Sequence, residues 1–183
     1  MAERDQHAII LDFMPQGYVD DKRPSHRKTP IAQALGTKKF TLLELVPREG
    51  VFLGIGDEVY IGDGKREKIH HVEGRIPLDK LTNTATNELG YVVEQLVEKN
   101  EQRFIDFFNN AQPLSTRMHS LQLLPGVGKK HMWDVLEERE DKPFKDFKDL
   151  DERVKLLPDP KKLVIRRIMN ELKGNEKHKL FTE

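Results

Sequence analysis

The chain has 183 residues, enough for one medium domain or two small ones, and it is 37% hydrophobic and 34% charged. Its 31 basic side chains balance 31 acidic ones, which excludes a uniformly basic nucleic-acid coat but not a local basic patch. It has no cysteine, so it can form neither disulfides nor thiolate metal sites. It also has no apolar run near the ~18 residues of a membrane span and no signal-peptide core. We therefore expect a cytoplasmic protein away from membranes.

Short β-prone segments separated by glycine-rich turns fill residues 1–77. The run His7–Phe13 is typical of a buried strand, and Phe40–Val46 is typical of another. Gly56–Gly62 alternates acidic with apolar side chains, and Asp63-Gly64 then signals a hairpin turn into a returning strand, Lys68–Ile76. Because closure removes exposed strand edges, these segments predict a small barrel or half-barrel.

A long polar segment, residues 20–39, interrupts these strands. A loop of this length in a compact domain is usually functional or disordered. Basic side chains gather in its first half, namely Lys22, Arg23, Arg27 and Lys28. We therefore consider two interpretations, a solvated loop and a basic arm that meets phosphate.

Aromatic residues of the barrel region offer a second possible contact with nucleic acid. A surface that holds single strands needs side chains on which bases stack. The candidates are Tyr18, Phe40, Phe52 and Tyr60, with core packing as the alternative for each. Trp133, the one tryptophan of the chain, is most simply a packing residue.

From about residue 84 to residue 110 the apolar residues recur at spacings of three and four, which predicts one long helix. Its opposite face is mostly acidic, so we do not expect nucleic acid to bind there. Gly90 weakens the helix locally by about 1 kcal/mol and permits a bend. We expect residues 78–112 to connect the barrel to a helical C-terminal part.

The segment Leu123–Lys130 (LLPGVGKK) lies between two amphipathic patterns. Upstream, Ser115 or Thr116 is the predicted N-cap of a short helix, and downstream a helix is expected from Lys129 to Arg139. The proline ends the first helix, and the two glycines permit a tight turn. The turn presents the unpaired N–H groups of the second helix, where the helix dipole favours an anion. The pattern therefore predicts phosphate binding, with a plain helix–helix turn as the alternative.

A weaker copy follows, because Leu123-Leu124-Pro125 recurs as Leu156-Leu157-Pro158 before two lysines and an amphipathic helix. Asp159 puts a negative charge where a phosphate would lie, so this copy is interpreted as mainly structural. Basic side chains on the helix leave room for a lateral backbone contact, namely Lys161, Lys162, Arg166 and Arg167. Residues 175–183 are expected to form a frayed polar tail.

The LLPGVGKK segment resembles the helix-hairpin-helix motif of DNA- and RNA-binding proteins. The resemblance implies sequence-independent contact with nucleic-acid backbone through the amides of Gly126, Gly128 and His131. It also implies a possible K⁺ or Na⁺ ion at hairpin carbonyls, which by position are those of Gln122, Leu124 and Val127. Met132 stands where the motif usually has a small residue, which weakens the expectation for the cation. The predicted contact residues are Gly126, Val127, Gly128, Lys129, Lys130 and His131.

The whole chain is similar to a mainly archaeal family of predicted RNA-binding proteins, through Gly56–Gly62, the long middle helix and the hairpin. That resemblance implies an OB-type barrel followed by tandem helix-hairpin-helix motifs, and RNA related to translation or the ribosome as partner. The resemblance implies no particular catalytic reaction.

Catalysis has little support, since the sequence has no Gly-rich phosphate loop ending in Lys-Ser/Thr, no HExxH and no Gly-x-Ser-x-Gly elbow. We therefore predict an α+β protein with a barrel over residues 1–77, a connecting helix over 78–112 and a helical domain over 113–183. We expect a non-enzymatic protein that binds RNA or DNA. A structural module that docks a protein is the alternative, and a structure-specific nuclease is weaker.

Overall fold

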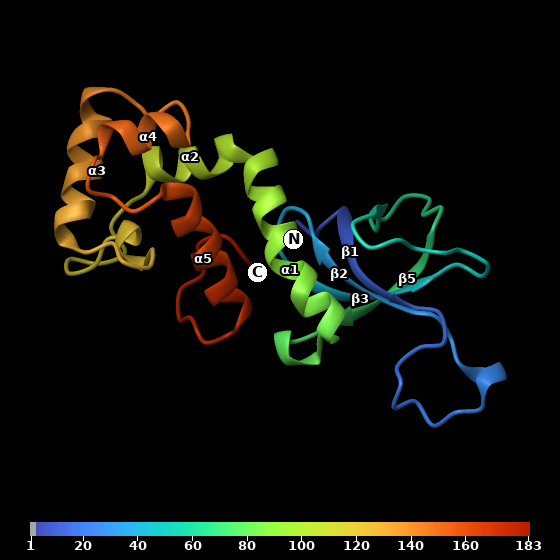
Figure 1. Cartoon of the computed structure of the whole chain (residues 1–183). Helices are drawn as coiled ribbons and strands as arrows, with labels where there is room; N and C mark the ends of the chain where they lie inside the picture. Colours follow the sequence, from blue (N-terminus) through green and yellow to red (C-terminus); the bar gives the residue numbers. More distant parts are fainter. Residues whose placement is uncertain (1–2) are drawn as a thin grey trace. The chain divides into compact units, whose positions relative to one another are not determined.

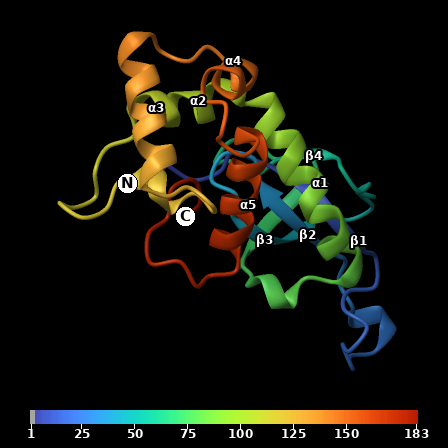
Figure 2. The same ribbon diagram turned by 60° about the vertical axis from the view of Figure 1, so that its left-hand side comes forward.

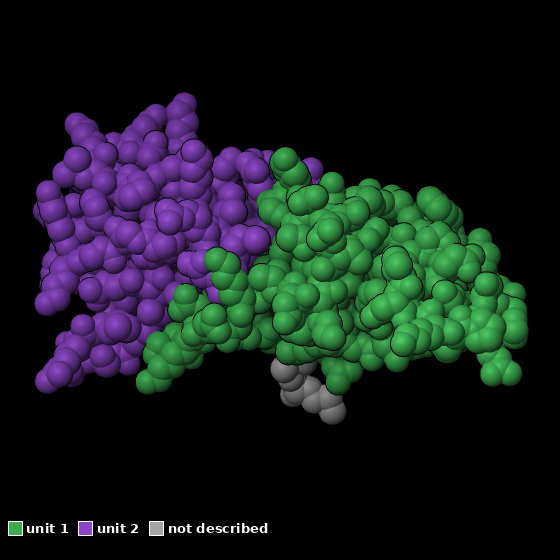
Figure 3. Space-filling model, turned by 60° about the horizontal axis from the view of Figure 1, so that its bottom comes forward, with its two compact units in different colours: residues 1–92, 171–183 green, residues 93–170 purple. Residues whose placement is uncertain are grey.

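The computed structural model describes residues 3–183, and the chain divides into two compact units (Figure 1). The first unit comprises residues 1–92 and 171–183, and the second comprises residues 93–170 (Figure 3). The predicted boundaries at residues 77 and 112 do not coincide with these limits. None of the helices described for residues 3–183 has the length and apolar character that a membrane crossing requires.

The first unit is built on a five-stranded antiparallel sheet with the strand order β4-β1-β2-β3-β5. The strands are β1 (His7–Met14), β2 (Ile31–Gly36), β3 (Leu42–Pro47), β4 (Glu58–Tyr60) and β5 (Ile69–Arg75). The end strands β4 and β5 do not pair with each other, so the sheet is a half-barrel and the α+β class is confirmed. The predicted hairpin at Asp63-Gly64 is wrong, because β4 pairs with β1 while β5 pairs with β3.

Strand β2 lies inside the segment that we predicted to be a polar loop, and that prediction is wrong for residues 31–36. Ala32, Ala34 and Leu35 are fully buried between β1 and β3, where small side chains fit. Gln33 is buried too, and its amide donates to the carbonyl of Lys80 (3.0 Å) and accepts from the N–H of Thr82 (2.9 Å). These bonds remove the cost of burying a polar group.

The core of the half-barrel is apolar and comes from every strand. It includes Ile10, Ala32, Ala34, Leu43, Leu45, Leu53, Val59, Ile61 and Ile69. Val59 and Ile61 point inward, which confirms the alternation predicted for Gly56–Gly62. Two 3₁₀ turns, η1 (Ser25–Arg27) and η2 (Leu78–Lys80), lie in the connections.

The long middle helix is two helices, α1 (Asn83–Lys99) and α2 (Glu101–Asn110), so the prediction of a single helix is wrong. The break lies at Asn100 (φ −116°, ψ 33°) rather than at Gly90. The side-chain amide of Asn100 donates to the Leu96 carbonyl (2.8 Å), and its own carbonyl accepts from the N–H of Arg103 (3.0 Å). These local bonds compete with the helical ladder and end it.

The second unit contains α2, the 3₁₀ turn η3 (Ser120–Leu123), α3 (Lys129–Asp141), α4 (Phe147–Arg153) and most of α5 (Pro160–Leu172). Helix α3 runs from η3 at one end to the loop before α4 at the other (Figure 2). The buried side chains of this unit are large and apolar, among them Phe104, Ile105, Phe108, Leu121, Val135, Leu150, Leu163, Val164 and Ile168.

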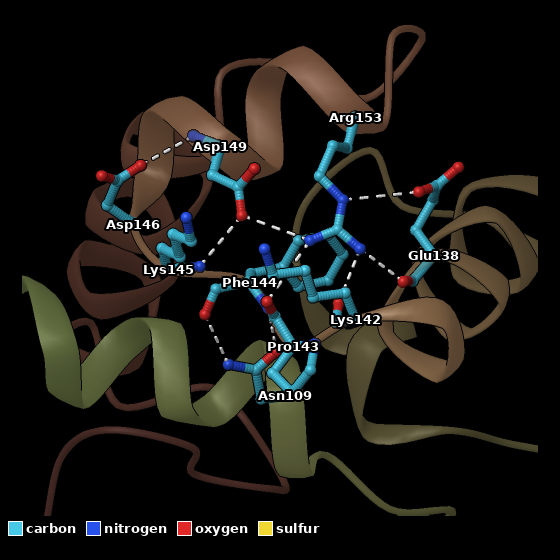
Figure 4. A network of polar contacts seen from close by, with 9 residues as sticks. All are labelled: Asn109, Glu138, Lys142, Pro143, Phe144, Lys145, Asp146, Asp149 and Arg153. Carbon is cyan, nitrogen blue, oxygen red and sulfur yellow. Dashed lines mark hydrogen bonds and ion pairs between the residues drawn. The ribbon is translucent and has the colours of Figure 1, made fainter.

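Arg153 fastens α4 to the C-terminal end of α3 (Figure 4). Its guanidinium donates to the carbonyls of Glu138 (2.5 Å) and Lys142 (2.6 Å) and to the carboxylate of Asp149 (3.2 Å), and it lies over the Phe144 ring. A helix leaves its last carbonyls without partners, so a cation placed there satisfies them and complements the helix dipole. Arg153 therefore links α4 to α3 within the second unit.

Residues 175–183 are not a frayed tail, and that prediction is wrong. The buried carboxylate of Glu171 accepts from the backbone N–H of Leu180 (2.5 Å) and Phe181 (3.1 Å). The Phe181 ring is buried as well, and Glu183 pairs with Lys39 (2.9 Å). The segment is thereby held in the first unit.

Candidate nucleic-acid interface

The turn after η3 depends on Gly126. Its φ of 84° lies in the left-handed region, which residues with a Cβ rarely adopt. The N–H of the next residue, Val127, donates to the Leu124 carbonyl (3.1 Å), and the Val127 side chain is buried. The turn is thus anchored to the core by the residue between its two glycines.

Helix α3 begins without a side-chain cap. Its N-cap is Gly128, and the first intrahelical bond runs from the N–H of Met132 to the Gly128 carbonyl (3.0 Å). The N–H groups of Lys129, Lys130 and His131 precede that bond and have no acceptor within the helix. The side chains of both lysines are exposed. The structure thus has open amides and two cationic side chains at the predicted position.

None of the residues that the structure describes requires a glycine at position 128. Its backbone is extended (φ −95°, ψ −167°), a conformation open to any residue. A Cβ at this position would meet no heavy atom within 4 Å. Serine, aspartate or asparagine would cap the helix better than glycine does. The glycine leaves the helix start open to a group from outside.

The helix upstream of the turn is shorter than predicted. It is the 3₁₀ turn η3, and its N-cap is His119, so the prediction of Ser115 or Thr116 as cap is wrong. The N–H groups of Leu114 and Ser115 both donate to the Met118 carbonyl (2.8 and 3.1 Å), which closes a loop instead. The observed motif is a 3₁₀ turn, a glycine turn and one α-helix.

His119 holds η3 in place. Its Nδ1 accepts from the N–H of Leu121 (3.1 Å), and its own N–H donates to the side chain of Gln122 (2.8 Å). Burial, reinforced by the charge of Arg139, lowers the pKa of the imidazole. The lowered pKa favours the neutral ring, and in that ring, with Nδ1 as an acceptor, the proton lies on Nε2.

Trp133 does not pack in the core, and the prediction that it does is wrong. Its side chain is 63% exposed on α3, one turn beyond Lys129. It lines a groove of about 1330 Å³ between α3 and the loop of residues 113–119. The sequence does show that Trp133 follows Lys129 by four residues, which puts both on one face of the helix.

The carbonyls predicted to hold a cation are partly engaged. Leu124 already accepts from Val127, and the guanidinium of Arg167 donates to the neighbouring Leu123 carbonyl (3.0 Å). A buried guanidinium this close opposes a second positive charge. The K⁺ or Na⁺ site at Gln122, Leu124 and Val127 stays a prediction.

In the second copy of the motif, a carboxylate occupies the helix start. Asp159 accepts from the N–H groups of Lys161 (3.0 Å) and Lys162 (3.4 Å) at the beginning of α5. The ammonium of Lys161 is paired with Glu98 (2.8 Å), which raises the pKa of Lys161. The Arg167 side chain is almost fully buried. Of the four predicted cations, these two are already engaged within the protein.

The basic segment of residues 22–28 belongs to the first unit, whereas the hairpin belongs to the second. Lys22, Arg23 and Arg27 are exposed around η1, and Lys28 is half-buried. Arg23 pairs with Asp21 (2.7 Å) and, through that hydrogen bond, lowers the pKa of Asp21 to about 2. Lys22 and Arg27 are the more accessible charges of this segment.

The four barrel aromatics differ in accessibility. Phe40 is 1% exposed and cannot stack on a base, whereas Phe52 is 76% exposed. Tyr60 is half-buried against His7, and its hydroxyl accepts from the N–H of Gly64 (2.9 Å). The hydroxyl of Tyr18 donates to Glu44 (2.5 Å); burial, with that hydrogen bond, raises the pKa of Tyr18 to about 12. Phe52 is the most accessible of the four.

Comparison with known proteins places the chain in a family. The family model described as "Protein of unknown function (DUF655)" matches residues 4–183. The chain belongs to the DUF655 family. It is 44% identical over 177 residues to the uncharacterized protein MJ0038 of Methanocaldococcus jannaschii, covering 97% of this chain and 78% of that protein.

A crystal structure within the DUF655 family has the same fold. Af1531 from Archaeoglobus fulgidus superposes with a TM-score of 0.89 at 46% identity, over 97% of this chain and 99% of that one. Both relatives are archaeal, as the whole-chain resemblance implied. Neither description names an activity or a ligand.

Proposed function

We propose that this DUF655 protein binds nucleic acid without catalysing a reaction, and that it holds the phosphate backbone at residues 126–131. The observation that carries the proposal is the uncapped start of α3. Three amides without helical acceptors, the helix dipole and two exposed lysines converge there, and Gly128 adds no side chain. Backbone amides at a helix start bind phosphate in many proteins.

The second copy of the motif supports this proposal. At the start of α5 the carboxylate of Asp159 accepts the hydrogen bonds that a phosphate would accept at α3. An anion at that position is therefore compatible with this local fold. At the start of α3 the anion must come from outside.

The finer parts of the proposal rest on resemblance. RNA as the preferred partner, in a translation- or ribosome-related assembly, comes from the whole-chain similarity, and so do the OB-type and helix-hairpin-helix descriptions of the two units. We include Phe52 as a stacking residue and Lys22 and Arg27 as phosphate contacts of the first unit. Arg23 and Lys28 contribute less, because Arg23 is paired and Lys28 is half-buried.

A protein-docking module is the second candidate. It is favoured by three exposed apolar side chains near the hairpin, those of Leu114, Met118 and Trp133. Net neutrality of the chain is also compatible with it. It does not account for the uncapped glycine at position 128.

The test is a fluorescence-anisotropy titration of the full chain at several salt concentrations, with single-stranded RNA and duplex DNA of one length. Each neutralised phosphate contributes a slope of about −0.9 (duplex) or −0.7 (single strand) to log K against log salt. About three to five contacts then predict a slope of roughly −2 to −4.5. Replacing Lys129 and Lys130 by alanine should flatten the slope by about one to two units.

The exposed lysines Lys177 and Lys179 provide the matched control, because their replacement by alanine removes the same charge away from the hairpin. That double variant should keep the slope of the unmodified chain. Absence of binding to either nucleic acid at low salt contradicts the proposal and favours the docking module.

A further inference from the structure

The surface next to the open helix start is apolar. Trp133 is 63% exposed, Leu114 is 45% exposed and Met118 is 44% exposed, and all three line the groove between α3 and the loop of residues 113–119. Large apolar side chains exposed together on one surface mark interaction sites more often than isolated ones do. The indole of Trp133 is the largest of these surfaces.

Charge changes sign along this groove. Lys129 lines it at the hairpin end, whereas Glu137 and Glu140 line it farther along α3. Helix rise puts Trp133 about 6 Å beyond Lys129, and Glu137 about 6 Å beyond Trp133. Arg117 also lines the groove, from the loop. An anionic ligand therefore fits the hairpin end and is repelled from the far end.

Arg139 reduces this polarity only in part, because it brings one positive charge and the two carboxylates of Glu137 and Glu140 line the same groove. It lines the groove, but its guanidinium donates to the carbonyls of Phe108 (3.1 Å) and Ala111 (2.9 Å). These hydrogen bonds join α3 to the C-terminal end of α2 within the second unit. The groove thus has a cationic end at Lys129, next to the open amides, an aromatic middle at Trp133 and a far end where acidic side chains outnumber basic ones.

We propose that Trp133 stacks on a base of single-stranded nucleic acid whose phosphate lies at Gly128–Lys130. This inference rests on the proposed function and adds the form of nucleic acid that the site prefers. In a duplex the bases are paired and stacked inside the helix, so their faces are not available to an indole. A single strand can turn one base outward onto the ring.

The acidic end limits the length of strand that the groove accepts. A strand that continued along α3 past Trp133 would bring its next phosphates to Glu137 and Glu140. The phosphates and these two carboxylates are all negatively charged, so they would repel each other. The groove therefore accommodates one or two nucleotides, and the rest of the strand leaves it. A small footprint of this kind predicts weak dependence on base sequence, since every base has a π-face.

The chain has its own probe for this contact, because Trp133 is its one tryptophan. An unlabelled single-stranded RNA oligonucleotide is titrated into the full chain while the indole fluorescence is recorded. We expect the emission to change in parallel with binding measured by anisotropy of a labelled oligonucleotide. Trp133→Ala should weaken single-strand binding about 5- to 150-fold, from stacking energies per base. Trp133→Phe should recover most of that loss.

Tyr91 gives the matched control, since it is an aromatic residue 67% exposed on α1 in the first unit. Tyr91→Ala should leave the affinity unchanged. The ratio of single-strand to duplex affinity should fall in Trp133→Ala, with circular dichroism used to verify that the variant is folded.

The outcomes separate the two proposals. Binding by anisotropy without a change in indole emission, or with equal affinity in Trp133→Ala, overturns the stacking contact and leaves phosphate binding at the hairpin standing. Failure of the unmodified chain to bind any nucleic acid overturns the proposed function, and the stacking contact with it. A loss in Tyr91→Ala as large as in Trp133→Ala also overturns the assignment to this groove.

Discussion

Each of the two Leu-Leu-Pro segments leads into an α-helix, and the two helices differ at their first residues. In the first copy, the helix α3 begins at Gly128 without a side-chain cap. In the second copy, the carboxylate of Asp159 caps the start of α5. The amides at the start of α5 are therefore satisfied by the protein itself, whereas those at the start of α3 have no side-chain cap.

The lysines that follow the two prolines also differ in whether they have partners within the protein. Lys129 and Lys130 are exposed, whereas Lys161 is held by Glu98 (2.8 Å) and is close to Glu94 (3.9 Å). In the second copy, the backbone amides of Lys161 and Lys162 and the ammonium of Lys161 thus have partners within the protein. Arg153, which lies upstream of the second copy, donates to a carbonyl near the end of α3.

The largest expected effect comes from giving the first helix a carboxylate. Gly128→Glu should abolish most nucleic-acid binding, because it places charge and bulk against the phosphate. Gly128→Asp should also weaken binding at least tenfold, while stability holds or rises by about a few tenths of a kcal/mol because aspartate is a good cap. Gel-shift titration measures the binding, and thermal unfolding measures the stability.

Gly128→Ala is the size control, since a Cβ at this position meets open space. It should lose far less binding than either acidic variant. Unchanged binding in a folded Gly128→Glu variant, as judged by circular dichroism, would falsify the assignment of the hairpin as the phosphate site.

A smaller effect is expected at the second copy. Asp159→Ala removes the cap of α5 and should lower the free energy of unfolding by about 0.5–2 kcal/mol. Nucleic-acid affinity should stay within twofold of the unmodified chain, and Asp159→Asn should retain most of the stability because asparagine also caps. Chemical denaturation and anisotropy titration are the measurements. Equal losses of affinity at positions 159 and 128 would show that the two copies are not different in function.

The smallest effect concerns pH. The elements upstream of the two Leu-Leu-Pro segments have different N-caps. His119 caps η3, and Asp146 caps α4. Burial lowers the pKa of His119 in the folded chain, so the unfolded chain binds the proton more readily. The neutral imidazole therefore contributes stability that is present above the unfolded pKa of about 6.5 and lost as the pH falls through the lower folded pKa.

His119→Asn tests this dependence, since asparagine can still accept from the N–H of Leu121 but does not titrate. Melting temperatures measured from pH 8 down to pH 5 should fall more steeply for the unmodified chain than for the variant. Parallel curves for the two proteins would show that His119 is not responsible for the acid-side loss.

Local patterns predicted the elements that depend on nearby residues. Strand β1, the inward alternation around Val59, and α3 all follow from periodicity and turn residues. The pairing of β4 with β1 and of β5 with β3 did not follow, because it joins strands distant in sequence while the Asp63-Gly64 signal is local. Strand β2 was missed because its alanines have low strand propensity and are buried only between neighbours.

The candidate site was predictable in its backbone and less so in its surroundings. Pro125, Gly126 and Gly128 indicate an open helix start in any context. Exposure of Trp133 and burial of Phe40 depend on which surfaces the rest of the chain covers, and a single aromatic residue carries no signal of that. Asp159 was informative as well, since a carboxylate after Pro158 predicted that the protein itself would supply an anion at the start of α5.

Residues 171–183 belong to the first unit, and this determines the order in which the two units can complete their folding during synthesis. Residues 93–170 are contiguous, so the second unit has all its residues once residue 170 has been made. The first unit is incomplete for longer, because Glu171 receives its amide partners and Phe181 is buried only after residues 171–183 have left the ribosome. The unit that is translated first is therefore the one that is finished last.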